Sequence, residues 1–339
     1  MRAKVAFFEI EPWEQAYITE HMDREMEFAF FSDPLTIDNV ELARPFEIIS
    51  PFIYSDLSRE VIEQLPNLSF IATRSTGFDH IDISACRERN IEISNVPSYG
   101  ENTVAEHTFS LILALSRKIL PSAERTRRGN FNLEGLRGFD LKGKTIGIIG
   151  AGHIGQHVIR IAHGFDMNIL VFDVRRDELL AKNLGFKYAD LDELLATSDI
   201  ITLHAPYNPY THHLINRRNI HRIKRGAILI NTSRGGLVET AALVEALNEG
   251  ILVGVGLDVL EEEGLIKEES QLLSHEFPHE RLRIALETHL LLFRDDVIIT
   301  PHNAFNSVEA VQRIIDTTIA NINALVAGKP QNIISLKAA

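Results

Sequence analysis

The sequence holds a single cysteine, Cys86, so it can form no internal disulfide bond. No apolar run approaches the ~18 residues of a membrane-spanning helix, and the apolar stretch near the start is too short for a signal peptide. Repeats and low-complexity tracts are absent as well. Because disulfides are rare in a reducing cytosol, these absences favour a cytoplasmic protein without a membrane partner.

Positive charge is also scarce: 34 Lys and Arg residues stand against 47 Asp and Glu residues, which gives a net charge of −13. Such an acidic protein is poorly suited to bind nucleic acid or an anionic membrane as its main partner. The 339 residues, 45% of them hydrophobic, are typical of a globular protein with two domains. We therefore expect a small molecule, and no nucleic acid, as the ligand.

A glycine-rich turn is the strongest local signal. Residues 145–149 read as a buried strand that breaks into Gly150-Ala-Gly152-His-Ile-Gly155, and an apolar helix pattern follows. This G-x-G-x-x-G spacing is typical of dinucleotide binding. Gly150 would make the tight turn, Gly152 would let the backbone approach a pyrophosphate, and Gly155 would let the helix pack closely. The helix N-terminus then offers N–H groups to the phosphates.

An acidic residue at the end of the next strand supports this interpretation. The strand at residues 168–172 ends in Asp173, about 20 residues beyond the first glycine, where an acid binds the ribose hydroxyls of NAD. A carboxylate there favours NAD over NADP, because it repels a 2′-phosphate. Arg175 and Arg176 follow closely and leave NADP open as an alternative. A plain surface aspartate at a strand end is the other interpretation of Asp173.

Strands alternating with helices predict two open parallel sheets. In the first part we expect helices at 12–22 and 57–65 and strands at 4–9, 46–50, 68–73 and 91–94. In the second part we expect strands at 145–149, 168–172, 199–203, 227–231, 252–257 and 297–300. The second set is apolar throughout, as in a doubly wound dinucleotide fold with both faces covered.

The long amphipathic helix at 307–327 is expected to return to the first sheet, which makes the first domain discontinuous. The predicted domains are a substrate-binding domain (1–101 and 301–339) and an inserted dinucleotide-binding domain (102–300). A helix over 101–120 would bridge them. The polar stretch at 121–144 would be an arm over the surface or over a partner subunit.

Three side chains follow neighbouring strand ends, where ligands bind in such sheets. They are Arg234, a carboxylate from the run 261–263, and His302. Arg234 can bind a substrate carboxylate in a bidentate fork. His302 can give a proton to a carbonyl oxygen while a nicotinamide delivers hydride, and a carboxylate beside the imidazole raises its pKa. Alone, Arg234 could be a surface residue and His302 a strand-end cap.

The segments GAGHIG, NTSRGGLV, GLDVLEEE and TPHNAF, with Asp173, resemble those of the D-isomer-specific 2-hydroxyacid dehydrogenases. RSTGFDHID and VPSYGENTVAEHT extend the resemblance over nearly the whole chain. It implies a Rossmann-type NAD domain inserted into a discontinuous flavodoxin-like catalytic domain, and a homodimer. It also implies that Arg234 binds substrate, that His302 is the proton donor, and that Glu263 pairs with His302.

The same resemblance assigns the remaining site residues. It implies that Asp258 lies near the nicotinamide carboxamide, that Ser75, Thr76 and Gly77 meet the substrate carboxylate, and that Tyr99 lines the substrate pocket. The cofactor would be contacted by Gly150, Gly152, His153, Ile154, Gly155, Asp173, Ala205, Pro206, Thr211 and Thr232.

Within this family the sequence is most similar to the D-lactate dehydrogenases, which implies reduction of pyruvate or a similar short 2-keto acid. Gly100-Glu101 and Asn303-Ala304-Phe305 depart from the pattern of the lactate enzymes and put substrate size in doubt. Glyoxylate, hydroxypyruvate, or branched or aromatic 2-keto acids are the alternatives. An NAD(H)-sensing protein that resembles the family's corepressors is the alternative outside catalysis.

We expect no catalytic or metal-binding role for the remaining histidines or for Glu261 and Glu262. His204, His212 and His213 share one loop, but no cysteine or acid spacing accompanies them, so we expect no metal. His80 and His107 are expected to be structural. Glu261 and Glu262 are expected to face solvent.

Overall fold

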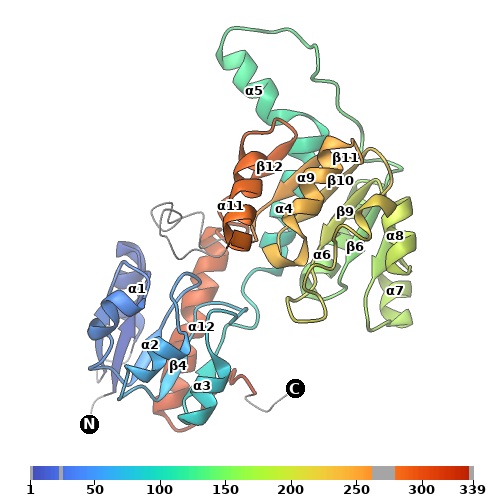
Figure 1. Cartoon of the computed structure of the whole chain (residues 1–339). Coiled ribbons are helices and arrows are strands. Elements are labelled where there is room, and N and C mark those ends of the chain that lie inside the picture. The colour runs from blue at the N-terminus through green and yellow to red at the C-terminus, as the bar shows by residue number, and fades with distance from the viewer. Residues whose placement is uncertain (1–2, 23–25, 262–278, 336–339) are drawn as a thin grey trace. The chain divides into compact units, whose positions relative to one another are not determined.

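The computed structural model describes residues 3–22, 26–261 and 279–335. The chain forms two compact units: unit 1 comprises Met1–Gly100 and Ser307–Ala339, and unit 2 comprises Glu101–Asn306. Each unit has its own parallel sheet and its own core (Figure 1). No helix in the described ranges is both long enough and apolar enough to cross a membrane.

Unit 1 is built on a five-stranded parallel sheet of order β2-β1-β3-β4-β5, the flavodoxin-like order. Its elements are β1 (Lys4–Phe7), α1 (Pro12–His21), β2 (Glu27–Phe30), η1 (Ile37–Leu42), β3 (Ile48–Ser50), α2 (Arg59–Glu63), β4 (Phe70–Ala72), α3 (Ile83–Glu88), β5 (Glu92–Ser94) and α12 (Val308–Val326). The central strands β3 and β4 are fully buried, as strands covered on both faces must be.

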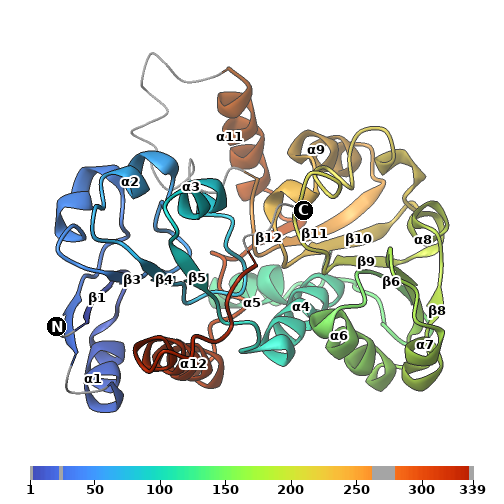
Figure 2. The ribbon, with the colours of Figure 1, turned by 90° about the horizontal axis from the view of Figure 1, so that it is seen from below.

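Helices cover both faces of this sheet (Figure 2). On one face, α2 and α3 pack Val61, Ile62 and Ala85 into the core. On the other face, α1 and α12 contribute Ile18 and Ile315, and burial of such a side chain stabilises the fold by about 2 kcal/mol. The predicted return of the C-terminal helix to the first sheet is confirmed.

Unit 2 is built on a seven-stranded parallel sheet of order β12-β11-β10-β9-β6-β7-β8, a Rossmann-type order with one further strand. Its elements are α4 (Glu101–Ser116), α5 (Ile119–Arg127), β6 (Thr145–Ile149), α6 (His153–Gly164), β7 (Asn168–Phe172), α7 (Glu178–Leu184), β8 (Lys187–Tyr188), α8 (Leu191–Thr197), β9 (Ile200–Leu203), η2 (Ile220–Arg222), β10 (Ala227–Asn231), η3 (Gly235–Leu237), α9 (Thr240–Asn248), β11 (Leu252–Leu257), α11 (His279–Leu292) and β12 (Val297–Ile299).

The helices of unit 2 also form two layers. One core contains buried side chains of α4, α6 and α7, and the other contains those of α8, α9 and α11. The strand order reverses between β6 and β9, so a crevice for a ligand is expected beyond the carboxyl ends of these two strands. The predicted fold class, two doubly wound parallel sheets, is confirmed. Strands β2 and β8, at the sheet edges, were not predicted.

The predicted helix over 101–120 is wrong at its end. Helix α4 stops at Ser116, Lys118 adopts a left-handed backbone (φ 53°), and α5 begins at Ile119. The reason is tertiary: the N–H of Phe139 donates to the main-chain oxygen of Ser116 (2.9 Å), which caps α4. Part of the predicted arm is therefore helical, and Figure 1 shows α5 projecting from the rest of unit 2.

Candidate active site

The glycine turn after β6 has the geometry that its sequence predicts. Gly150 has φ +103°, and a Cβ there would lie 2.6 Å from the main-chain oxygen of His204. A Cβ at Gly155 would overlap the main-chain oxygen of Gly150, so α6 packs against the turn only because this residue is glycine. At Gly152, which caps α6, a Cβ would meet no atom within 4 Å, so the turn leaves open space for a ligand there.

Asp173 lies beside this turn. Its carboxylate accepts hydrogen bonds from the N–H groups of Ala151 (2.7 Å) and Arg175 (2.9 Å), which fix it next to the glycines. Arg176 pairs with Asp190 at 2.5 Å, so this guanidinium already has an acidic partner.

The first turn of α6 and two further loops carry the other predicted cofactor residues. His153 is exposed and lies 3.3 Å from Glu101, and Ile154 follows it. Ala205 and Pro206 follow β9, and the hydroxyl of Thr211 donates to the main-chain oxygen of Pro206 (2.7 Å), which closes this loop. After β10, Thr232 is buried.

Arg234 stands on a rigid segment after β10. The side chain of Asn231 donates to the main-chain oxygen of Arg234 (2.9 Å), and the hydroxyl of Ser233 donates to that of Leu203 (2.8 Å). A Cβ at Gly235 would overlap the backbone of Leu260, so the segment packs directly on the chain that leaves β11. This packing fixes the backbone from which the guanidinium extends.

His302 has a left-handed backbone, with φ 52°, which is uncommon for a residue other than glycine. Its N–H donates to the main-chain oxygens of Asp258 (2.8 Å) and Thr300 (2.9 Å). The next two N–H groups, of Asn303 and Ala304, donate to the carboxylate of Asp258 (3.0 and 2.8 Å). Asp258 thus holds three consecutive residues of the turn.

The charge of Asp258 suits this role. Burial raises the pKa of its carboxyl group, but hydrogen bonds from His107, Thr300 and the two main-chain N–H groups outweigh burial. The pKa therefore lies below its ordinary value, and the group is a carboxylate at neutral pH. A buried acceptor with this many donors is a stable anchor.

The expectation that Glu261 faces solvent is wrong. Its side chain is only 9% exposed and lies 2.5 Å from Nε2 of His213. It also accepts hydrogen bonds from the N–H and hydroxyl of Thr240, at the start of α9 (3.0 and 2.7 Å). The donors come from segments distant in sequence, so the acidic run alone could not reveal them. Glu262 and Glu263 lie outside the described residues.

In unit 1, Ser75, Thr76 and Gly77 form a tight loop after β4. The hydroxyl of Ser75 donates to the main-chain oxygen of Gly77 (2.6 Å), and that of Thr76 donates to Val96 (2.7 Å). Within the described part of the chain, the three N–H groups of this loop donate no hydrogen bond. They form a group of donors suited to an anion. Tyr99 is held through its main-chain oxygen by Arg313 (2.9 Å).

Arg74 directly precedes the Ser75 loop and was not among the predicted site residues. Its side chain links this loop to the segments at the carboxyl ends of β1 and β3. Its side chain is fully buried and donates to the main-chain oxygens of Phe8, Glu9 and Ser50, which follow or end β1 and β3. Burial lowers the pKa of Arg74, with Glu14 and Glu9 opposing the shift. An arginine directly after an apolar strand was the only local signal for this clamp.

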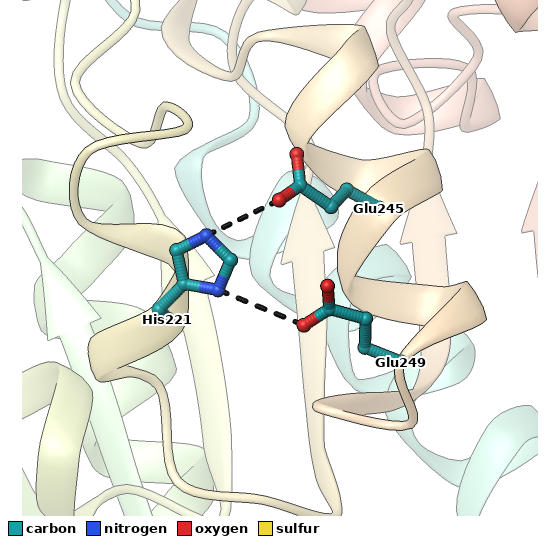
Figure 3. A group of neighbouring side chains, drawn as sticks. All are labelled: His221, Glu245 and Glu249. Carbon is teal, nitrogen blue, oxygen red and sulfur yellow. Dashed lines mark ion pairs between the residues drawn. The ribbon is translucent and has the colours of Figure 1, made fainter.

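One group among the described residues has the composition of a metal site: His221, Glu245 and Glu249 (Figure 3). The two ring nitrogens of His221 face different carboxylates, Nε2 at 3.2 Å from Glu245 and Nδ1 at 3.7 Å from Glu249. Arg217 also lies 3.4 Å from Glu245. The group precedes β10 and β11, at the edge of the sheet opposite to the glycine turn. Ion pairing accounts for this exposed cluster.

Comparison with known proteins assigns the family. The family model described as "D-isomer specific 2-hydroxyacid dehydrogenase, NAD binding domain" matches residues 109–304. The chain belongs to the D-isomer specific 2-hydroxyacid dehydrogenases. It is 34% identical to D-lactate dehydrogenase of Escherichia coli (strain K12) over 331 residues, which cover 96% of this chain and 98% of that protein.

Two further proteins that are similar to this chain have names that state different substrates. This chain matches the crystal structure of D-lactate dehydrogenase from Aquifex aeolicus complexed with NAD and lactic acid with a TM-score of 0.86. The two chains are 34% identical, and the match covers 96% of each. Glycerate dehydrogenase of Methylorubrum extorquens is 37% identical over 281 residues, which cover 81% of each protein. The chain is thus an NAD-dependent dehydrogenase, and its glycine turn with Asp173 fits that cofactor.

Proposed function

We propose that this dehydrogenase reduces a short 2-keto acid, with pyruvate as the first candidate, to the D-2-hydroxy acid. The observation that carries the proposal is the placement of Arg234 and His302 after β10 and β12, which flank β11 in one parallel sheet. The carboxyl ends of these strands lie at the same edge, where substrates of such folds bind. Asp258, after β11, anchors the His302 turn.

Each side chain has a defined task in this proposal. The guanidinium of Arg234 binds the substrate carboxylate and orients the 2-keto group. The imidazolium of His302 gives its ring proton to the carbonyl oxygen as that oxygen gains charge, and the neutral ring accepts the proton in the reverse reaction. Bound NADH supplies the hydride that reaches the carbonyl carbon. Glu263 is proposed to stabilise the imidazolium.

The remaining assignments are proposals of the same kind. Unit 1 would bind substrate through the N–H groups of Ser75, Thr76 and Gly77, with Tyr99 lining the pocket. Unit 2 would hold NAD through Gly150, Gly152, His153, Ile154, Gly155 and Asp173, with Ala205, Pro206, Thr211, Thr232 and Asp258 completing the cofactor site.

We also propose a homodimer. In and after α5, four apolar side chains are at least half exposed: Ile119 (51%), Leu120 (52%), Phe131 (77%) and Leu133 (79%). Exposed apolar side chains clustered along one segment favour an interface. Sedimentation velocity of the native chain and of a Phe131→Asp, Leu133→Asp variant would test it, since only the native chain should sediment as a dimer.

The test of the substrate is NADH oxidation, followed by absorbance, with pyruvate, hydroxypyruvate, glyoxylate, 2-ketoisocaproate and phenylpyruvate. We expect the highest kcat/KM with pyruvate and a D-lactate product by chiral analysis. Preference for hydroxypyruvate or a larger acid would keep the reaction and change the substrate. Tight NADH binding without turnover of any acid would favour the NAD(H)-sensing alternative.

A further inference from the structure

His107 of α4 lies against the anchor of the His302 turn. Its Nε2 is 3.1 Å from the hydroxyl oxygen of Thr300 and 3.4 Å from Oδ1 of Asp258. The hydroxyl of Thr300 donates to the same Oδ1. His107 lies 193 positions from Thr300 in the sequence, and its side chain is 20% exposed. The three side chains form a connected polar group beneath the turn.

The direction of these hydrogen bonds follows from the single hydroxyl proton of Thr300. That proton is donated to Asp258, so the hydroxyl oxygen can only accept from His107. Nε2 of His107 must therefore carry a hydrogen, whether the ring is neutral or protonated. His107 thus reaches the Asp258 carboxylate in two ways, directly from Nε2 to Oδ1 and through the hydroxyl of Thr300, and hydrogen bonds connected in this way polarise one another.

The same carboxylate determines the position of His302. Asp258 accepts from the N–H groups of Asn303 and Ala304, while its main-chain oxygen accepts from His302. The left-handed backbone of His302 persists only because its surroundings over-determine it. Rotation of the Asp258 carboxylate would release two of the N–H groups that hold the turn.

We propose that His107 is a positioning residue of the dehydrogenase reaction: through Thr300 it fixes the Asp258 carboxylate, which sets the position of the His302 turn. The inference rests on the proposed role of His302 as proton donor. Because His107 acts through the Asp258 carboxylate and makes no contact with the keto acid in this proposal, its loss lowers kcat and leaves the KM for the keto acid nearly unchanged. A small displacement of a reacting group can cost up to about 100-fold in rate.

Two amides of different length provide the test. In His107→Gln the terminal nitrogen reaches about as far as Nε2, whereas in His107→Asn it reaches only as far as Nδ1. We expect His107→Asn to lower kcat at least about 10-fold and His107→Gln to restore it to within about 3-fold of the native enzyme. Equal kcat for His107→Asn and the native enzyme would overturn the proposal, and so would equal losses in both variants.

A double-mutant cycle tests the route through Thr300. Thr300→Val removes the hydroxyl at nearly constant shape, and its effect on kcat should not multiply with that of His107→Asn, because both act on one carboxylate. Fully multiplicative losses would contradict that route. The melting temperature of each variant is measured together with its kcat. If the loss of kcat is proportional to the fall in melting temperature in all variants, His107 has a structural role only.

His302→Ala separates the two levels of the proposal. If His302→Ala keeps a near-normal rate, the proton-donor assignment fails, whatever the His107 variants do. If His302→Ala loses at least about 100-fold while His107→Asn turns over normally, the positioning role alone fails.

Discussion

The carboxylate of Glu261 lies 2.5 Å from Nε2 of His213 and is satisfied further by Thr240. Glu261 is thus committed to joining the segment after β11 to the loop after β9 and to the start of α9. These contacts argue against Glu261 as the acid that pairs with His302, and comparison of Glu263 and Glu261 variants tests the pairing.

The first prediction compares Glu263→Gln with Glu261→Gln. Reduction needs protonated His302. On the proposed pairing, Glu263→Gln removes the charge that stabilises the imidazolium, so the kcat profile should move toward acid. Glu261→Gln should leave the position of the profile unchanged and lower the melting temperature. A shift in the Glu261 variant alone would transfer the pairing role to Glu261.

The second prediction concerns Arg234. Arg234→Ala should lower kcat/KM for the keto acid at least about 100-fold, since a charge-assisted bidentate pair contributes about 3 kcal/mol. Arg234→Lys keeps the charge without the fork and should fall between alanine and the native enzyme. Fluorescence titration should give NADH affinity within about 3-fold of native for both. Unchanged turnover in Arg234→Ala would refute the substrate-binding role.

The third prediction concerns cofactor choice. Asp173→Asn removes the charge that repels a 2′-phosphate and leaves one of the two N–H groups, of Ala151 or Arg175, without its acceptor. The ratio of kcat/KM for NADH to that for NADPH should fall at least about 10-fold, which corresponds to about 1.4 kcal/mol. Arg176→Ala is the matched control, because its guanidinium is paired with Asp190 and should contribute little. An unchanged ratio in Asp173→Asn would show that the preference lies elsewhere.

The fourth prediction concerns stability at acid pH. Nδ1 of His204 is buried and has no hydrogen-bond partner among the described residues, and Nε2 lies 2.9 Å from the hydroxyl of Thr202. Burial lowers the pKa of His204 to about 3. Its folded-state pKa is thus below the unfolded value, so stability is fully present above about pH 6.5 and is lost as pH falls toward 3.

Between pH 7.5 and pH 5.0 this residue should cost at most about 2 kcal/mol of the free energy of unfolding. His204→Gln, which keeps a nitrogen near Thr202, should lose less stability over that range than the native chain. Urea unfolding at the two pH values measures the difference. Equal losses in both proteins would mean that the imidazole titrates normally when folded.

Several features of the site follow from short stretches of sequence. The turn at Gly150 and Gly155, and the adjacent Asp173, could be predicted because the spacing of one strand, one turn and one helix fixes them locally. The order of apolar strands also predicted that Arg234 and His302 leave the same edge of one sheet, since parallel strands have their carboxyl ends together. The observed bounds of most strands also agree with the predicted bounds to within two residues.

Other features depend on partners far away in the chain. The carboxylate of Glu261 is held by His213 and Thr240, and the buried guanidinium of Arg74 donates to three main-chain oxygens, two just after β1 and one at the end of β3. The edge strands β2 and β8 escaped prediction, because an edge strand is covered less and needs no uninterrupted apolar run.

Periodicity and spacing along one backbone were enough to specify the two sheets, the dinucleotide turn and the chemical types present at the strand ends. Only the tertiary structure showed that Glu261 is paired with His213, that α4 ends at Ser116, and that His107 contacts Thr300 and Asp258 beside the His302 turn. Each of those outcomes depends on hydrogen bonds between residues that are tens to hundreds of positions apart in the sequence, and no local pattern specifies such a contact.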